Sequence, residues 1–257
     1  MKIAIVGAGN MGRAIIDGLL DQVDASDIII STPENPTLQP WVNQRAFTIV
    51  HDNTELLALD FDYLIFTTPA KVTLNIMQTL AKLPAKTTIL SAAAGIRLAD
   101  MKDAFTNQHN LAIFMPNTPV AINAGTIGTT ILADNASAKE AILNLLNVLG
   151  DTFEISETDF GIFGTVAGCG PAFVDIFMEA LSDAAVANGL NRQLSYQVIS
   201  SMLKGTASLQ MATGQTPAEL KNTVTSPGGT TIKGVLALEA QPFRRAVTDA
   251  IDAANHN

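Results

Sequence analysis

The chain has 257 residues, and 47% of them are hydrophobic, enough to build one large domain or two modest ones around buried cores. Its 15 lysines and arginines are outnumbered by 24 aspartates and glutamates. The resulting formal charge of −9 argues against non-specific binding to nucleic acid or to anionic membranes. The single cysteine, Cys169, cannot form an intrachain disulfide and suits a reducing compartment, so we expect a cytoplasmic protein.

No targeting segment, membrane span or metal site is expected. Lys2 precedes an apolar stretch that runs directly into glycines, which is not the pattern of a signal peptide. Residues 110–133 carry no charge, but Pro116, Asn117 and Pro119 among them disfavour a continuous membrane helix. The three histidines are scattered along the chain, without the spacing of metal ligands.

The start of the chain predicts a strand, a glycine turn and a helix. The short apolar run Ile3–Val6 is typical of a buried parallel strand. It leads into Gly-x-Gly-x-x-Gly at residues 7–12 and then into an apolar-periodic stretch that predicts a helix. A lone glycine motif also fits an ordinary strand-to-helix turn, but this order favours a dinucleotide-binding Rossmann unit.

Each position of the motif has a physical role in that unit. Gly7 permits the tight turn, Gly9 lets the backbone approach a pyrophosphate, and Gly12 lets the helix pack close to the strand. The free N–H groups at Asn10 and Met11, together with the helix dipole, favour an anion.

Further apolar runs predict the rest of a mostly parallel sheet, with ligands beyond the carboxyl ends of its strands. The predicted strands are 27–31, 48–50, 62–68, 87–91, 111–115, 126–132 and 152–155, and helices are predicted around 40–46 and over 136–149.

The predicted second strand ends in Ser31 and Thr32, and the nearest acidic residue, Glu34, is displaced further along. NAD-preferring Rossmann folds usually place a carboxylate at this point. Small hydroxyl side chains instead leave room for a 2′-phosphate, which favours NADPH, with NADH also possible. The alternative is ordinary turn chemistry of serine and threonine.

Two other strand ends are expected to face the cofactor. The first is Thr68, Pro69 and Ala70. The second consists of small residues that would let a flat ring lie close to the backbone, or that merely pack a helix on the sheet; they are Ala92, Ala93, Ala94 and Gly95.

From about residue 157 onward, strand-like runs disappear and helical patterns dominate. A helix is predicted over 172–188 that is hydrophobic almost all round, with Pro171 at its first position, and a second helix over about 191–213. In a half-chain of this size, such a helix usually needs a partner chain to cover one face, so we expect an oligomer.

A second glycine-containing loop, Ser226-Pro-Gly-Gly-Thr-Thr231, leads into a predicted helix. Its exposed N–H groups and hydroxyls can hold a carboxylate without a lysine or arginine. A plain helix cap would have the same composition, and both interpretations stand at this point.

Taken together, these motifs resemble the pyrroline-5-carboxylate reductase family nearly end to end. The resemblance rests on 7–12, Ser91–Ile96, Met115–Pro119, Gly168–Phe173 and, most specifically, Glu219–Lys221 with Thr225–Thr231. It implies a Rossmann domain over 1–156 and an all-α substrate-binding and dimerisation domain over 157–257. It also implies NAD(P)H-dependent reduction of L-1-pyrroline-5-carboxylate to L-proline, the last step of proline biosynthesis, by a dimer or a larger ring of dimers.

The resemblance also implies where ligands bind. It places the substrate carboxylate on Ser226, Gly228, Gly229 and Thr230, and the catalytic hydroxyl of Thr231 near the ring nitrogen. Because a protonated imine is already a good electrophile, Thr231 is expected to supply geometry and a proton path. The implied cofactor residues, with the motif glycines, are Gly7, Gly9, Asn10, Met11, Gly12, Ser31, Thr32, Asn53, Thr68, Pro69, Ala70, Ala92, Ala93, Ala94, Gly95 and Asn117.

Some positions depart from the family pattern. Ala167, Cys169 and Phe173 replace two hydroxyls and a phenol, and Pro69 stands where a lysine is usual. The alternatives are therefore a reductase of a related cyclic imine and a catalytically silent NADP-binding protein. A hydroxyacid dehydrogenase would need a catalytic lysine in the helical half, but Lys221 belongs to the reductase pattern.

Overall fold

The computed structural model describes residues 1–255, and its contacts divide the chain into two compact units between Gly168 and Cys169. Each unit is described by itself. Residues 157–168 belong to the first unit because they pack on its sheet; the ring of Phe163, for example, lies 6.5 Å from that of Phe153. The domain boundary after residue 156, inferred from the sequence, stays a prediction.

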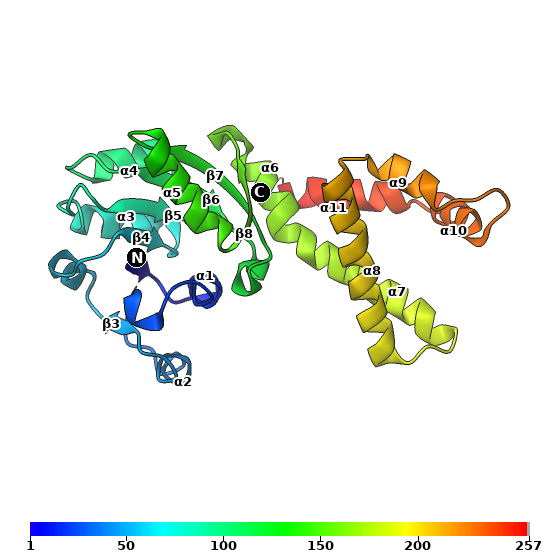
Figure 1. Ribbon diagram of the computed structural model, residues 1–257, viewed down its shortest axis with the longest axis horizontal. Helices are drawn as coiled ribbons and strands as arrows, with labels where there is room; N and C mark the ends of the chain where they lie inside the picture. Colours follow the sequence, from blue (N-terminus) through cyan, green and yellow to red (C-terminus); the bar gives the residue numbers. More distant parts are fainter. Residues whose placement is uncertain (256–257) are drawn as a thin grey trace. The chain divides into compact units, whose positions relative to one another are not determined.

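Within the described residues, the first unit contains one eight-stranded sheet of order β3-β2-β1-β4-β5-β6-β7-β8 (Figure 1). The strands β1 to β6 are parallel, β7 is antiparallel to β6, and β8 is parallel to β7. Their bounds are β1 Ile3–Val6, β2 Ile28–Ser31, β3 Thr48–Val50, β4 Tyr63–Phe66, β5 Thr88–Ser91, β6 Leu111–Met115, β7 Gly125–Leu132 and β8 Gly150–Glu154. The uncharged stretch 110–133 therefore forms strands and a short 3₁₀ helix, Thr118–Ile122.

The register of the central strands brings their carboxyl ends level. Val6 lies opposite Ser31 on one side and Phe66 on the other, and Phe66 lies opposite Ser91. The loops that follow these strands therefore emerge at one edge of the sheet, on both sides of the point where the strand order reverses. Ligands bind at that edge in folds of this kind.

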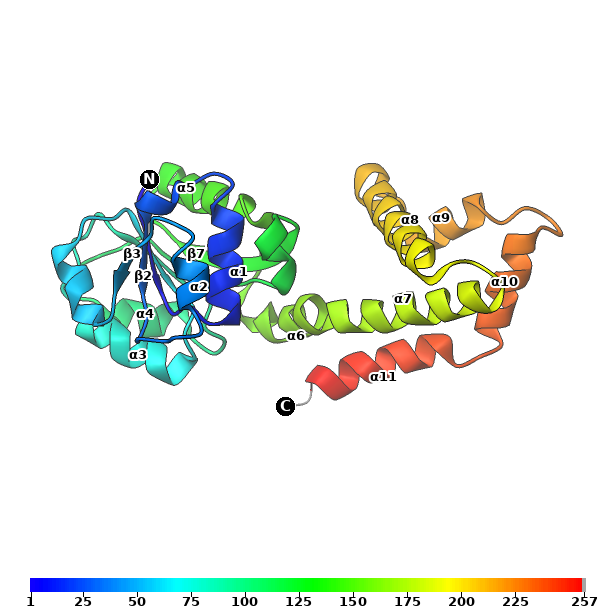
Figure 2. The ribbon, with the colours of Figure 1, turned by 90° about the horizontal axis from the view of Figure 1, so that it is seen from below.

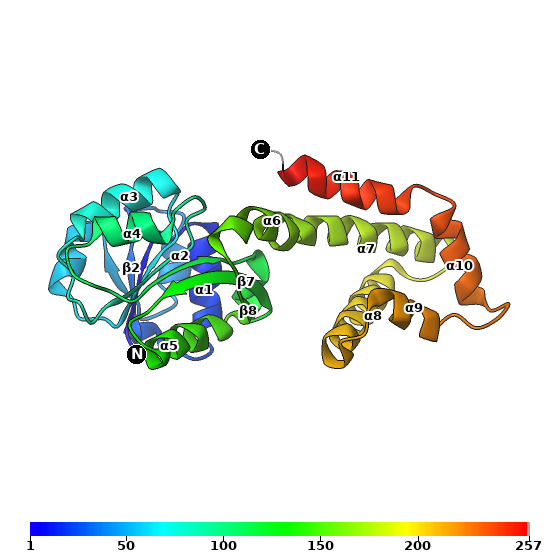
Figure 3. The ribbon, with the colours of Figure 1, turned by 90° about the horizontal axis from the view of Figure 1, so that it is seen from above.

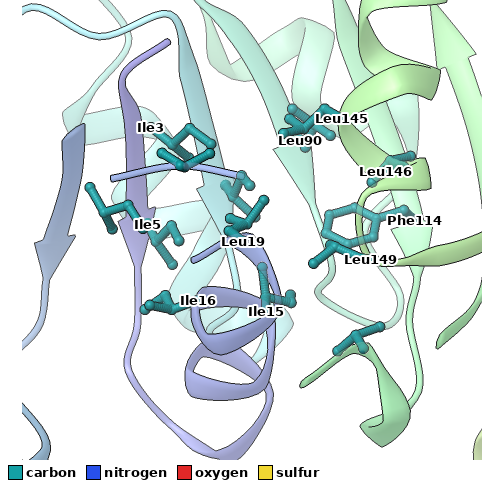
Figure 4. Packing of buried hydrophobic residues seen from close by; sticks show 14 of the residues in the cluster. Ile3, Ile5, Ile15, Ile16, Leu19, Leu90, Phe114, Leu145, Leu146 and Leu149 are labelled. Atoms are coloured by element: carbon teal, nitrogen blue, oxygen red, sulfur yellow. The ribbon is translucent and has the colours of Figure 1, made fainter. Parts of the chain in front are cut away.

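Alternate residues of each strand feed two separate cores, because successive side chains point to opposite faces of a sheet. Ile3 and Ile5 belong to the same core as residues of α1 (Asn10–Leu19) and α5 (Ala136–Asn147), and Figure 4 shows them beside Ile15, Ile16 and Leu19 of α1. Ala4 and Val6 pack with α3 (Ala70–Thr79) and α4 (Leu98–Ala104) on the other face (Figure 3).

The helix predicted around 40–46 is shorter in the structure. The helix α2 spans Gln39–Val42 only. The N–H of Arg45 then donates to the carbonyl of Val42, and this turn brings the chain into β3 at Thr48. The need to pair β3 with β2 ends the helix early.

The second unit consists of helices. They are α7 Gly170–Ala187, α8 Arg192–Thr213, α9 Pro217–Thr223, α10 Thr230–Glu239 and α11 Phe243–Asn255, preceded in the first unit by α6 Phe160–Gly164. The helices α7 and α8 form a hairpin (Figure 2). Its corner is held by buried polar groups, since Ser182 and Ser195 share a hydrogen bond and Arg192 donates to Ser182 at 2.7 Å.

This unit has almost no core of its own. Within residues 169–255, Ile199 is the only apolar side chain that is buried, whereas Ile176 on α7 is 66% exposed and Met211 on α8 is 61% exposed. The helical segment Glu157–Ala187 is long enough to cross a membrane, and an 18-residue window within it has a mean hydropathy of 1.5, but only 6% of that window is buried. So much apolar surface requires a partner.

We expect Ile176→Asp to shift the protein from an oligomer toward the monomer, because a charge on this exposed apolar face opposes its burial against a second copy. Sedimentation velocity measures the mass. The matched control is Leu132→Asp on β7, where the leucine is 44% exposed in the first unit. An unchanged mass for Ile176→Asp, with a normal helical circular dichroism spectrum, would contradict the expectation.

Candidate functional site

The glycine turn after β1 is built by close contacts between backbone atoms. Gly7 has φ of +101°, which favours glycine, and its N–H donates to the carbonyl of Ser31 at 2.9 Å. A Cβ at Gly12 would collide with the carbonyl oxygen of Gly7, so only glycine lets α1 come this close. A Cβ at Gly9 would instead meet nothing within 4 Å, which leaves that side of the turn open.

The amino end of α1 is available to an anion. Gly9 is its N-cap, and no side chain caps the helix. The N–H groups of Asn10 and Met11 therefore lack a capping side chain, and the helix dipole adds positive potential there. These residues fit the pyrophosphate of a dinucleotide.

Thr67, which sequence reasoning missed, holds the glycine turn in place. Its hydroxyl lies 2.8 Å from the carbonyl oxygen of Gly7 and 3.1 Å from that of Val6. The signal in the sequence was its position directly after β4, because the pairing of β4 with β1 puts Thr67 beside Gly7.

The end of β2 carries neutral polar groups. Ser31 is buried and donates through Oγ to Oδ1 of Asn53 at 2.7 Å, which leaves the amide NH₂ of Asn53 free to bind an acceptor. The ring of His51 lies across the strand end, with Nδ1 2.9 Å from the carbonyl of Thr32. Glu34 is exposed. These neutral groups suit a hydroxyl or a phosphate on the ribose.

The hydroxyl of Thr68 is used in the turn that starts α3. Thr73 is buried and donates to the carbonyl of Thr68, so Thr68 Oγ1 donates to Thr73 Oγ1 at 2.8 Å. Its remaining capacity is as an acceptor. Pro69 is the N-cap of α3, and Ala70 is its first residue.

The four small residues after β5 divide between two roles. Ala92 and Ala93 pack against the two cores, whereas Ala94 and Gly95 are exposed. A cavity of about 490 Å³ opens beside them, with Met115 among its walls. A volume in this range suits a small ligand. The assignment of these residues to the cofactor stays a prediction.

Both the oxygen and the nitrogen of the Asn117 side-chain amide form hydrogen bonds. It is 7% exposed, its Oδ1 accepts from the N–H of Thr126 at 2.8 Å, and its Nδ2 donates to the carbonyl of Ala167 at 3.0 Å. Ala167 precedes Pro171 by four residues, and proline has no N–H to donate to it. Asn117 therefore donates to a carbonyl whose regular α-helical partner would be Pro171. Its role toward the cofactor stays a prediction.

The helix expected to begin at Pro171 is part of a longer helical segment. The helix α6 leads through a π-helical turn, Thr165–Cys169, into α7 at Gly170. Single π-turns inside helices often mark functional sites. Pro171 accounts for this one, because its missing N–H interrupts the regular bonding. The loss of a hydroxyl at position 167 leaves the bond to Asn117 intact, because that bond uses the backbone.

The loop before α10 lacks a side-chain cap as well. Gly228 has φ of +69°, and the N–H of Gly229 donates to the carbonyl of Ser226 at 3.0 Å. Gly229 is the N-cap of α10 and has no side chain to cap the helix, so the N–H groups of Thr230 and Thr231 are available. This argues against a plain capping motif and fits a carboxylate.

Glu219 begins the stretch that is most specific to the family resemblance, but its side chain has a structural role rather than a ligand-binding one. It forms a capping box with Thr216 at the start of α9. The N–H of Thr216 donates to this carboxylate and lowers the pKa of Glu219 below its ordinary value. No cluster of three or more potential metal ligands occurs in residues 1–255.

A mostly parallel sheet with an open glycine turn at its carboxyl edge, followed by a helical unit with a second uncapped helix start, is typical of dinucleotide-dependent oxidoreductases of the two-unit Rossmann class. Family models agree. The model described as pyrroline-5-carboxylate reductase dimerisation matches residues 157–257, and that described as NADP oxidoreductase, coenzyme F420-dependent, matches residues 2–95.

Individual proteins are similar over nearly the whole chain. Pyrroline-5-carboxylate reductase of Escherichia coli is 32% identical, covering 97% of this chain and 94% of its own. Pyrroline-5-carboxylate reductase 3 of Rattus norvegicus is 34% identical, with 98% and 93% covered. The NADP-bound Plasmodium falciparum reductase structure has a TM-score of 0.82 at 26% identity, with 99% and 95% covered. The chain belongs to the pyrroline-5-carboxylate reductase family.

We expect Asn117→Ala to lower the free energy of unfolding by about 1 to 2 kcal/mol, because two part-buried hydrogen bonds to the backbone are lost. Asn117→Asp keeps the shape but lacks the Nδ2 donor, so it should destabilise at least as much. Thermal unfolding measures the effect, with Asn144→Ala on the exposed face of α5 as control. A stable Asn117→Asp protein would show that the bond to Ala167 is unimportant.

Proposed function

We propose that the protein reduces L-1-pyrroline-5-carboxylate to L-proline with NADPH, and with NADH as the weaker donor. The observation that carries the proposal is the uncapped helix start at Gly229, inside the stretch most specific to the family. Backbone N–H groups there offer a site for a carboxylate that needs no basic side chain. This suits an acidic protein that must hold an anionic substrate.

The residues of the first unit bind and orient the cofactor in this proposal. The N–H groups after Gly9 hold the pyrophosphate, and Ser31 and Asn53 receive the ribose. The open side of Ala94 and Gly95 accepts the nicotinamide ring in the adjoining cavity. When bound, NADPH supplies the hydride that is added to the imine carbon.

The residues of the second unit orient the substrate. Ser226, Gly228, Gly229 and Thr230 bind its carboxylate, and the hydroxyl of Thr231 lies by the ring nitrogen. Ser226 and Thr231 are exposed residues, and their hydroxyls can turn toward a ligand. Thr231 is a neutral group, and it acts by holding the imine in orientation and by relaying a proton to or from nitrogen.

The chain self-associates through residues 157–257, the part that matches the dimerisation model. We propose that a second copy, rather than lipid, covers the apolar surface of Glu157–Ala187, and that the dimers assemble further into rings. The acidic charge and single cysteine support a cytoplasmic enzyme that binds neither nucleic acid nor membrane.

The purified protein should oxidise NADPH rapidly when pyrroline-5-carboxylate is present, and should do so with a lower KM for NADPH than for NADH. Absorbance of the reduced nicotinamide follows the reaction, and formation of proline is measured separately. Cofactor binding without turnover would favour another cyclic imine as substrate, which a panel of imines tests, or a silent binding protein if the whole panel fails.

Thr231→Ala should lower kcat by about tenfold or more, because the hydroxyl orients the imine and relays its proton. The dissociation constant for NADPH should change much less. Thr231→Ser keeps the hydroxyl and should retain most activity. Thr248→Ala, an exposed threonine on α11, is the matched control. An unchanged kcat in Thr231→Ala would remove the residue from the mechanism.

A further inference from the structure

Arg13 differs from every other arginine in the described chain. The other five each form an ion pair with a carboxylate, but Arg13 forms none. The protein carries 24 acidic residues and a net charge of −9, so acidic partners are abundant. Within residues 1–255, Arg13 has no carboxylate partner and lies near the open side of the glycine turn. This suggests that its charge is matched by an anionic ligand.

The guanidinium of Arg13 has donors to spare. Its Nη2 donates to Oδ1 of Asn10 at 3.0 Å, and its Nε is buried with no hydrogen-bond partner in the described residues. A guanidinium carries five N–H donors. Because a buried donor without an acceptor costs free energy, an anion that accepts several of these bonds would be bound favourably.

Arg13 lies on the face of α1 that the segment after β2 covers. Asn10, Arg13 and Asp17 follow one another at helical spacing and form one row. Asp17, at the far end of the row, accepts from Nε1 of Trp41 at 3.1 Å and lies 3.4 Å from Arg45. Trp41 and Arg45 both follow β2 in the chain. Helical side chains lean toward the amino end, so Arg13 leans toward the edge where β2 ends.

The end of β2 is where this fold distinguishes NADPH from NADH, and an arginine nearby accommodates the 2′-phosphate. The groups that the structure provides at the strand end itself, Ser31 and Asn53, are neutral. Neutral donors leave the phosphate charge uncompensated. Arg45, the other arginine near this strand, is already occupied by Asp17 and the ring of Trp41.

We propose that Arg13 is the specificity-determining residue that binds the 2′-phosphate of NADPH. The guanidinium exchanges its contact with Asn10 for two parallel N–H bonds to phosphate oxygens, the geometry for which arginine is suited. NADH has a hydroxyl at this position and gains nothing from the charge. The inference rests on the proposed function for its cofactor, but it requires no particular substrate.

Direct titration of the full-length protein with NADPH and with NADH, followed by nicotinamide fluorescence without substrate, tests the proposal. Arg13→Met keeps the apolar stem and removes the charge. We expect its dissociation constant for NADPH to rise about ten- to a hundredfold, and that for NADH to change by less than about twofold. Arg13→Lys should recover part of the loss. Added KCl should weaken NADPH binding more in the unaltered protein than in Arg13→Met.

Two further variants test whether the preference for NADPH over NADH depends on Arg13 in particular or on any nearby positive charge. Lys71→Met removes a basic group that follows β4 at this edge, and Lys102→Met removes a charge on α4. Both should leave the NADPH to NADH affinity ratio close to that of the unaltered protein. An equal loss for the two dinucleotides in Arg13→Met would assign the residue to the pyrophosphate and overturn the proposal, as would unchanged NADPH binding.

The same titrations separate this inference from the proposed function. A protein that shows the selective loss in Arg13→Met but reduces no pyrroline-5-carboxylate would retain the inference and lose the function. A protein that turns over substrate but shows no selective loss would retain the function and lose the inference.

Discussion

The contact between Gly12 and the carbonyl of Gly7 is the constraint on which the ligand-binding edge depends. It lets α1 begin directly at the end of β1, and Thr67 secures the same carbonyl from the neighbouring strand. Any side chain at position 12 would push the helix away from the sheet. The uncapped N–H groups of α1 would then no longer point toward the carboxyl edge of the sheet, where the loops after the central strands emerge.

The two units are stabilised in different ways. The first has a core on each face of its sheet, with residues such as Ile5 and Phe66 fully or almost fully buried. The second buries little apolar surface within one chain and relies on a capping box at α9 and the polar corner between α7 and α8 for local order. Because burial of apolar surface is the main driving force for folding, this unit depends on association for its stability. The residues that we propose to bind the substrate lie on this unit, so we expect substrate binding to depend on assembly of the subunits.

Many strands of the first unit and its glycine turn could be predicted, because the spacing of apolar residues and of glycines determines local structure. The strands 48–50 and 111–115 have the predicted bounds, and the glycine turn follows β1 as the motif requires. Asn117 could not be understood in this way, since its partners lie 9 and 50 residues away and become neighbours only in the fold. The π-turn likewise follows from Pro171 acting inside a helix whose first part, α6, the sequence pattern did not reveal.

The two proposed anion sites share one feature that suits an acidic protein: neither uses a basic side chain. Both proposed anion sites, at α1 and α10, begin with glycine N-caps and use backbone N–H groups, whose partial charges act only at short range. Such sites accept a pyrophosphate or a carboxylate without creating a basic surface that would attract polyanions. They cannot by themselves tell a ribose hydroxyl from a ribose phosphate, because the difference between these groups is a full charge. A single unpaired arginine on the row from Asn10 to Asp17 supplies that distinction at the one position where it is needed.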